Sequence, residues 1–337
     1  MTGATALRAG LGLLPVLSFL VALVAMDSYK LVRLRLVAAV IAAGAVAAGL
    51  AYVANGSLLA VTGLGMDAYS RTLAPLVEEA LKAIVVIALV RAHRIGFLVD
   101  AAILGFAVGT GFALVENLAY LQRLFDAPTA VWIVRGFGTA LLHGGVQSIF
   151  AVWLLSRAER RGGVGPVTIA IPLLAAAALH ATFNQFVLPP VWQTLVLLVV
   201  LPPLMMLVFA RSEAAVRGWL GDGFDADRDL LALLDSGGFH AAPQGQYLQA
   251  LRAHFRGEVV ADLLCYLRLH VELALRAKGV LMMREEGIDM PIDEATRARF
   301  EEMRYLEATV GPTAVRSLKP LLHMSRRDLW QLYMLGK

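Results

Sequence analysis

Cysteine is nearly absent from this 337-residue chain, which has a single one at Cys265. With one thiol, neither an intrachain disulfide nor a cysteine-based metal cluster can form. Residues 211–337 contain no internal repeats or low-complexity runs. Charge is scarce in the first 210 residues, which hold 13 basic and 8 acidic side chains, whereas the shorter remainder holds 17 and 18. The chain therefore has a charge-poor part followed by a charge-rich part.

The small excess of positive charge excludes one class of partner. The formal net charge is +4, and it comes from the charge-poor part, where the basic residues are scattered among short connecting segments. Nucleic-acid binding needs a dense basic patch or stripe instead. We therefore expect no nucleic-acid partner and interpret the basic residues as a sign of membrane topology.

Apolar residues are abundant: they make up 58% of the chain, and the mean hydropathy is +0.68. These values are typical of a polytopic membrane protein, and a transmembrane helix takes roughly 20 apolar residues. Only Arg8 precedes the first apolar run, and no small-residue cleavage site follows it, so we expect a retained span rather than a signal peptide. The predicted fold class is an all-α transmembrane helical bundle of about seven spans: 10–27, 36–54, 72–90, 97–120, 131–155, 166–187 and 191–210.

Basic residues alternate between the two sides of the predicted bundle. They follow the first, third, fifth and seventh spans, whereas the opposite segments hold little beyond Arg71 and Arg123. Because basic loops stay in the cytoplasm, this pattern predicts an N-terminus outside and a C-terminus inside the plasma (inner) membrane. The residues that set the orientation are Lys30, Arg33, Arg35, Arg91, Arg94, Arg157, Arg160, Arg161, Arg211 and Arg217.

The charge-rich part predicts a second domain. Residues 1–210 would form the transmembrane domain and residues 211–337 a small cytoplasmic helical domain. Within the latter, 221–229 and 235–246 have the composition of loops, 247–282 has the spacing of one long amphipathic helix, and 293–310 opens with an acidic first turn typical of a helix.

Small residues in the fourth predicted span favour close helix packing. Gly105 and Gly109 have GxxxG spacing, and Gly111 follows. Such residues let helix backbones approach closely in lipid. Close packing here would separate a polar site from lipid.

Ionisable and amide side chains interrupt four consecutive predicted spans. Such groups are costly inside a bilayer unless they are paired or face water, so they indicate function. At 1.5 Å rise per residue, the glutamates of the third and fourth spans and the histidine of the sixth lie roughly 6–10 Å from the outer ends of their spans, with the histidine of the fifth somewhat deeper. We therefore expect one site, made of Glu78, Glu79, Lys82, Glu116, Asn117, His143, His180 and Asn184.

These side chains suit hydrolysis by either of two routes. A carboxylate could take a proton from water while an imidazole assists and an amide stabilises the oxyanion. Alternatively, Glu79, Glu116, His143 and His180 could hold a divalent metal such as zinc, whose bound water attacks; no metal is needed if the glutamate route operates. An ion- or proton-coupled transporter would use the same buried groups, and a non-catalytic membrane scaffold is a third class.

Four short motifs, in order and each on its own span, resemble the signature of the PrsW family of intramembrane proteases. They are "EEALK" (78–82), "GFALVEN" (111–117), "LLHGGVQ" (141–147) and "HATFN" (180–184), within roughly residues 70–190. The arrangement is more distantly similar to the CAAX prenyl proteases, which have a histidine where this chain has Glu116.

The resemblance implies a membrane metalloprotease whose substrate is a membrane protein, as in PrsW-like proteins that cleave membrane-anchored anti-sigma factors on the outer side. It implies nothing about residues 211–337. The site residues that it implies are Glu78, Glu79, Glu116, His143 and His180, with Lys82, Asn117 and Asn184 in support.

Overall fold

The computed structural model describes residues 3–124, 126–288 and 290–322, and within them it contains helices and no strand. The predicted all-α class is confirmed. The α-helices are α1 Gly3–Ala25, α2 Leu34–Thr62, α3 Met66–Arg91, α4 Leu98–Arg123, α5 Thr129–Ile133, α6 Leu141–Arg161, α7 Pro166–Asn184, α8 Pro190–Asp235, α9 Pro243–Ala250, α10 Gly257–Glu285, α11 Glu294–Val310 and α12 Pro312–Ser317. A π-helix, η1 Val134–Ala140, joins α5 to α6, and two short 3₁₀ turns, η2 Phe239–Ala241 and η3 Leu251–Ala253, flank α9.

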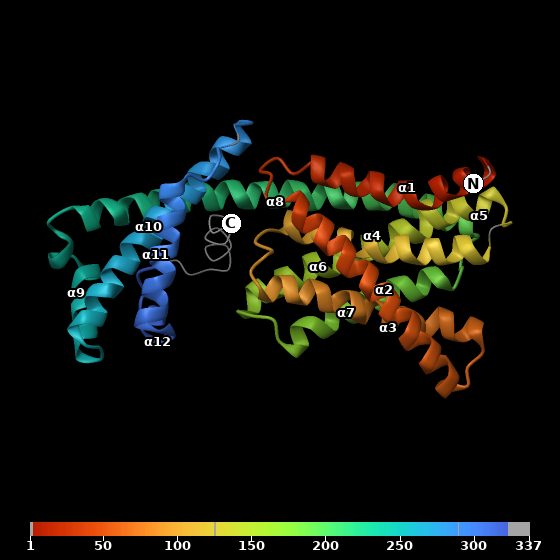
Figure 1. Cartoon of the computed structure of the whole chain (residues 1–337), viewed down its shortest axis with the longest axis horizontal. Helices are drawn as coiled ribbons and strands as arrows, with labels where there is room; N and C mark the ends of the chain where they lie inside the picture. Colours follow the sequence, from red (N-terminus) through yellow and green to blue (C-terminus); the bar gives the residue numbers. More distant parts are fainter. Residues whose placement is uncertain (1–2, 125, 289, 323–337) are drawn as a thin grey trace. The chain divides into compact units, whose positions relative to one another are not determined.

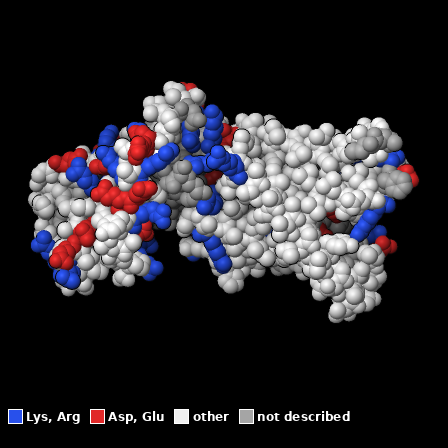
Figure 2. Space-filling view, viewed as in Figure 1, with Lys and Arg blue, Asp and Glu red and all other residues white. Residues whose placement is uncertain are grey.

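The chain divides into two compact units, Met1–Glu213 and Ala214–Lys337. The division falls within the long helix α8. The first unit contains α1–α7 and the apolar part of α8, and its visible flank is almost free of charge between charged side chains at its ends (Figure 2). The second unit contains the end of α8 and α9–α12.

Among the described residues, six helical segments are long and apolar enough to cross a membrane, whereas the sequence predicts about seven spans. The six are α1, α2, α4, the continuous run Thr129–Arg161, α7 and α8. Helix α3 has 26 residues, enough length for a crossing, but it carries Glu78, Glu79 and Lys82 near its middle. The role of α3 as a further span stays a prediction.

Helix α4 is the centre of the first unit. It lies among α1, α2 and α6 (Figure 1) and packs mainly against α6 and α2. Every residue from Val99 to Ala113 is buried. A Cβ atom on Gly105 would lie 2.5 Å from the Gln147 carbonyl oxygen, and one on Gly109 would overlap the backbone of His143. The predicted close packing is therefore present, and it brings α6 against α4 where His143 is located.

Two local predictions for the second unit are wrong. The predicted single helix 247–282 is broken: α9 and η3 end before Arg256, which has extended backbone angles, and α10 begins at Gly257. Glycine lowers helix propensity by about 1 kcal/mol, which favours a break there. The predicted loop 221–229 is instead helical, as part of α8.

Tertiary contacts explain that second difference. The Lys278 side chain lies over Gly223, and its Nζ donates to Asp227 Oδ2 at 2.5 Å. Packing against α10 thus keeps a glycine-containing segment helical against its propensity. The predicted helix 293–310 is confirmed, because α11 begins after Asp293, whose side chain accepts a hydrogen bond from the Thr296 N–H at 2.8 Å.

Candidate active site

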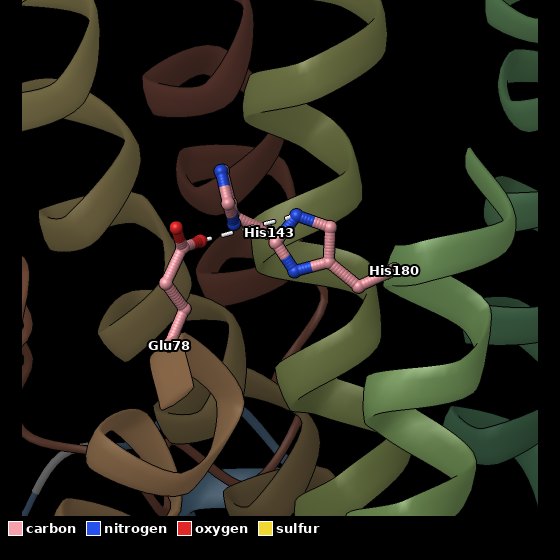
Figure 3. A group of neighbouring side chains, drawn as sticks. All are labelled: Glu78, His143 and His180. Atoms are coloured by element: carbon pink, nitrogen blue, oxygen red, sulfur yellow. Dashed lines mark ion pairs between the residues drawn. The ribbon is translucent and has the colours of Figure 1, made fainter. Parts of the chain in front are cut away.

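Three side chains from three helices meet inside the first unit. Glu78 comes from α3, His143 from α6 and His180 from α7, and they point toward one another (Figure 3). Each offers one ligand atom, and these atoms all lie within 4.8 Å of one another. Residues separated by about 100 positions in sequence therefore share one small volume.

Glu79 lies behind this group and is fully buried. Its Oε1 accepts from Lys82 Nζ at 2.5 Å and from His180 Nδ1 at 2.8 Å, and its Oε2 accepts from Gln147 Nε2 at 2.6 Å. Three donors from three helices favour the carboxylate form and fix its orientation. Glu79 therefore holds its neighbours in place rather than facing an incoming molecule.

Glu78 is the more accessible carboxylate of the pair, with 15% of its side chain exposed. Its Oε1 accepts a long hydrogen bond of 3.3 Å from Asn55 Nδ2 on α2, and Asn55 in turn accepts from Tyr69 Oη at 2.9 Å. Its Oε2 faces His180 Nε2 across 3.9 Å, which is too far for a hydrogen bond. Glu78 thus keeps capacity to bind a water or an ion.

His180 has a defined orientation because Glu79 holds one of its ring nitrogens. A carboxylate can only accept, so Nδ1 carries the proton, and in the neutral ring Nε2 then has a free lone pair. That lone pair is on the side of Glu78. A carboxylate behind a histidine in this way is typical of histidines that bind metals, since it fixes the tautomer and raises the basicity of the ring.

His143 is held at both ring nitrogens. Lys82 Nζ lies 3.1 Å from Nδ1, and an ammonium can only donate, so Nδ1 accepts. Nε2 then carries the proton and donates to Glu116 Oε2 at 3.0 Å. The ring packs edge-on against that of His180, with centroids 4.9 Å apart. His143 thus links the Glu79–Lys82 pair to Glu116.

Glu116 connects the site to a second cation that the sequence analysis did not select. Arg135 Nη2, from η1, lies 3.3 Å from Glu116 Oε2, and Arg135 Nε donates to Asn117 Oδ1 at 2.8 Å. Asn117 donates to the Gly12 carbonyl on α1 at 2.6 Å. Asn117 therefore anchors α1 and η1 to α4 at the side of the site.

Asn184 lies one turn beyond His180 and makes a different contact from those of the central group. Its Nδ2 donates to the Ser70 carbonyl at 3.1 Å. The bond ties the end of α7 to α3, the helix that carries Glu78 and Glu79. In this structure Asn184 thus fixes two site-bearing helices relative to each other.

Three polar residues of the network were missed by the sequence analysis. Arg135 is an ionisable residue inside a predicted span, which is by itself a functional signal. Gln147 follows His143 by four positions and so shares its helix face. Asn55 lies just beyond the predicted end of the second span and gave no comparable signal.

The donor set fits a divalent metal in kind. One carboxylate and two imidazoles are a common ligand set for catalytic zinc. Glu78 and His180 Nε2 have open positions, whereas His143 would have to give up Lys82 or Glu116 to bind an ion. Of the four metal ligands expected from the sequence, the two histidines belong to this close group, and Glu79 and Glu116 surround it.

Comparison with known proteins identifies the family. The family model of the PrsW family intramembrane metalloproteases matches residues 32–209, more than half of the chain. This chain belongs to the PrsW family. Comparisons with curated proteins and with solved structures gave no significant match. As a PrsW family member the chain is an intramembrane peptidase and an integral membrane protein, its substrate is a membrane protein, and the transporter alternative is not favoured.

Proposed function

We propose that Glu78, His143 and His180 form the hydrolytic centre of this PrsW family peptidase, with Glu79, Lys82 and Glu116 as positioning residues. The observation that carries the proposal is the contrast at the Glu78–Glu79 pair. Glu79 is saturated by three donors behind His180, whereas Glu78 faces the open nitrogen of the same ring. One carboxylate thus orients the site and the other is available for chemistry.

The side chains then have separate tasks. Glu78 uses its charge to accept a proton from the attacking water or to bind a metal ion. In the route without a metal, His180 is presented through Nε2, His143 donates its Nε2 proton to Glu116, and the proton that Glu78 takes from water passes to the leaving amine. Arg135 Nη2 lies 3.3 Å from the same Glu116 oxygen, Oε2, that His143 contacts. Asn117 joins α4 to α1, and Asn184 joins α7 to α3, so both hold helices in place around these groups.

For the metal route we propose that Glu78, His143 and His180 hold a divalent ion, with His143 giving up Lys82 or Glu116 to bind it. Such an ion, when bound, would act as a Lewis acid on the peptide carbonyl and activate a water. The donor types, the mutual approach within 4.8 Å and the Glu79 carboxylate behind His180 support this assignment.

The depth of the site supports cleavage near the outer leaflet. At 1.5 Å per residue, His143 lies roughly 21 Å from Arg157 along α6, and Glu79 lies roughly 18 Å from Arg91 along α3. Both arginines are at the helix ends assigned to the cytoplasm by the positive-inside rule. In a hydrocarbon core of about 30 Å the site is then in the outer half. A membrane-anchored anti-sigma factor cut on its outer side suits this position.

The same membrane orientation assigns a location to each of the two units. The membrane unit carries the peptidase, with its N-terminus outside. The second unit, rich in paired charges such as Arg276–Asp293 and Arg299–Glu272, forms a helical domain in the cytoplasm of the cell. The seventh crossing, by α3, is needed for this topology.

Cleavage of a candidate substrate tests the function. The wild-type chain and a Glu78→Gln variant, co-expressed with a tagged anti-sigma factor, are compared for new termini by mass spectrometry. We expect a defined outer-side cut with the wild type and none with Glu78→Gln. Glu159→Gln, an exposed glutamate of α6 outside the site, is the matched control and should cleave normally. Full cleavage by Glu78→Gln would overturn the assignment.

A further inference from the structure

A cavity of about 550 Å³ lies at the other end of α6, far from the catalytic group. Its walls come from the last three turns of α6 and from α8 between Leu204 and Val208. All of its residues belong to the first unit. None of them belongs to the network around Glu78.

One wall of this cavity is strongly basic. Arg157, Arg160 and Arg161 line it together with Ser156, and the described lining residues include no acidic side chain. Arg157 Nε is buried without a hydrogen-bond partner among the described residues, and Arg157 Nη2 makes only a long bond of 3.4 Å to the Val167 carbonyl. Among the described residues that line this cavity, these positively charged donors therefore face no acidic side chain.

The other wall is apolar and continues along the helix. A second cavity of about 440 Å³ lies between α6, α7 and α8 and is lined mainly by aliphatic side chains, with Thr182 and Gln193 as its polar members. The two cavities share Ile149 and Leu204 in their linings, so they adjoin, and together they are called the cleft. From Arg157 to Leu142 the cleft follows α6 for roughly 22 Å.

We propose that this cleft binds an anionic phospholipid, with the phosphate at the three arginines and one acyl chain along α6 and α8. A guanidinium cluster matches a phosphate group in charge and geometry. Basic pockets between transmembrane helices are the expected sites for anionic headgroups at the cytoplasmic face. Trp153 lines the basic cavity and is 39% exposed, as suits a side chain at the membrane interface.

The dimensions favour a lipid chain over a substrate helix. An α-helix with side chains is about 10 Å across, and a space of 440 Å³ drawn out along several turns of α6 is too narrow for one. An extended acyl chain, unlike an extended peptide, has no N–H or C=O groups that need hydrogen-bond partners, so it can pack against an aliphatic wall. The lipid would then lie beside α6 and α7, the helices that carry the two catalytic histidines.

Lipid titration of the purified full-length chain tests the proposal. In a nonionic detergent, native mass spectrometry measures binding of dioleoyl phosphatidylglycerol and dioleoyl phosphatidylcholine, which have the same chains. We expect the anionic lipid to bind at least about tenfold more tightly. Arg157→Gln/Arg160→Gln should remove this preference. The control Arg35→Gln/Arg91→Gln, which removes two exposed arginines outside the cleft, should keep it.

Two further measurements keep the result decisive. Ile149→Trp, which fills the junction of the two cavities, should weaken both lipids, and equal elution volumes and melting temperatures check that each variant is folded. Millimolar inorganic phosphate should leave the bound lipid in place. Equal affinity of the wild type for both lipids, a preference that survives Arg157→Gln/Arg160→Gln, or displacement by free phosphate would each overturn the proposal.

Discussion

Glu78 and Glu79 are adjacent in the chain, yet their carboxylates have different surroundings: Glu79 is fully buried among three donors, whereas Glu78 is 15% exposed and faces His180 Nε2 at 3.9 Å. Neighbouring helix residues point about 100° apart, so one side chain can enter the core while the next reaches the site. This geometry gives two chemically identical residues different surroundings, and we propose different roles for them. Substitutions at the two positions should therefore fail in different ways.

Glu78→Gln should abolish catalysis and leave the fold intact. The substitution keeps the shape and removes a charge that has one long hydrogen bond, from Asn55. Loss of a group in direct proton transfer lowers rates by about 10²–10⁴. We expect kcat to fall by that factor with an unchanged melting temperature in detergent. A large drop in melting temperature would show that Glu78 is structural.

Glu79→Gln should instead destabilise the protein. It leaves the Lys82 ammonium, which is fully buried, without its counter-charge. Removing one member of a buried ion pair costs about 3–5 kcal/mol, because the other charge remains desolvated. We expect a clearly lowered unfolding midpoint. In the double variant Glu79→Gln/Lys82→Met the midpoint should recover while activity stays lost, since His180 no longer has a carboxylate behind it. Recovery of activity would contradict the orienting role of Glu79.

The helix packing behind the site gives a prediction with a matched control. A Cβ atom on Gly109 would overlap the backbone at His143, whereas one on Gly49 in α2 would have nothing within 4 Å. Gly109→Ala should therefore displace α6, lower the unfolding midpoint and reduce cleavage sharply. Gly49→Ala should be neutral or slightly stabilising. Both are measured by thermal unfolding and by substrate cleavage, and equal behaviour of the two variants would show that this contact is unimportant.

How far the sequence predicts this structure depends on the kind of signal. Apolar length and motif order predict the all-α class and the gathering of Glu78, His143 and His180, since a carboxylate or imidazole inside a span is rare. Contacts between helices are less predictable. Nothing in the local sequence shows that Lys82 pairs with Glu79 rather than Glu78, because both spacings suit a helix. The composition of 221–229 predicts a loop, but the segment is helical because Lys278, about 50 residues later in the chain, packs over Gly223.

A substitution of Arg135 tests the part of the hydrogen-bond network around Glu116 that the sequence motifs do not include. It pairs with Glu116 and lies over the Tyr120 ring, with 3.6 Å from the guanidinium carbon to the ring centroid. Arg135→Gln should free Glu116 from its cation and loosen its hold on His143, lowering kcat about 10-fold or more with a small change in KM. Arg123→Gln is the control, because Arg123 contacts Tyr52 away from the site. Equal kinetics for the two variants would remove Arg135 from the network.

Metal content provides the test that separates the two hydrolytic routes. If Glu78, His143 and His180 hold the ion, elemental analysis of the purified chain should find about one divalent ion per molecule. His180→Gln should lose the ion, and Glu159→Gln should keep it. In the stable Glu79→Gln/Lys82→Met background the affinity should fall about 10–100-fold, the usual effect of removing a carboxylate behind a metal-binding histidine. A chelator should stop cleavage and zinc should restore it. Full cleavage by protein shown to contain no metal would establish the glutamate route, with Glu78 as the base acting on water.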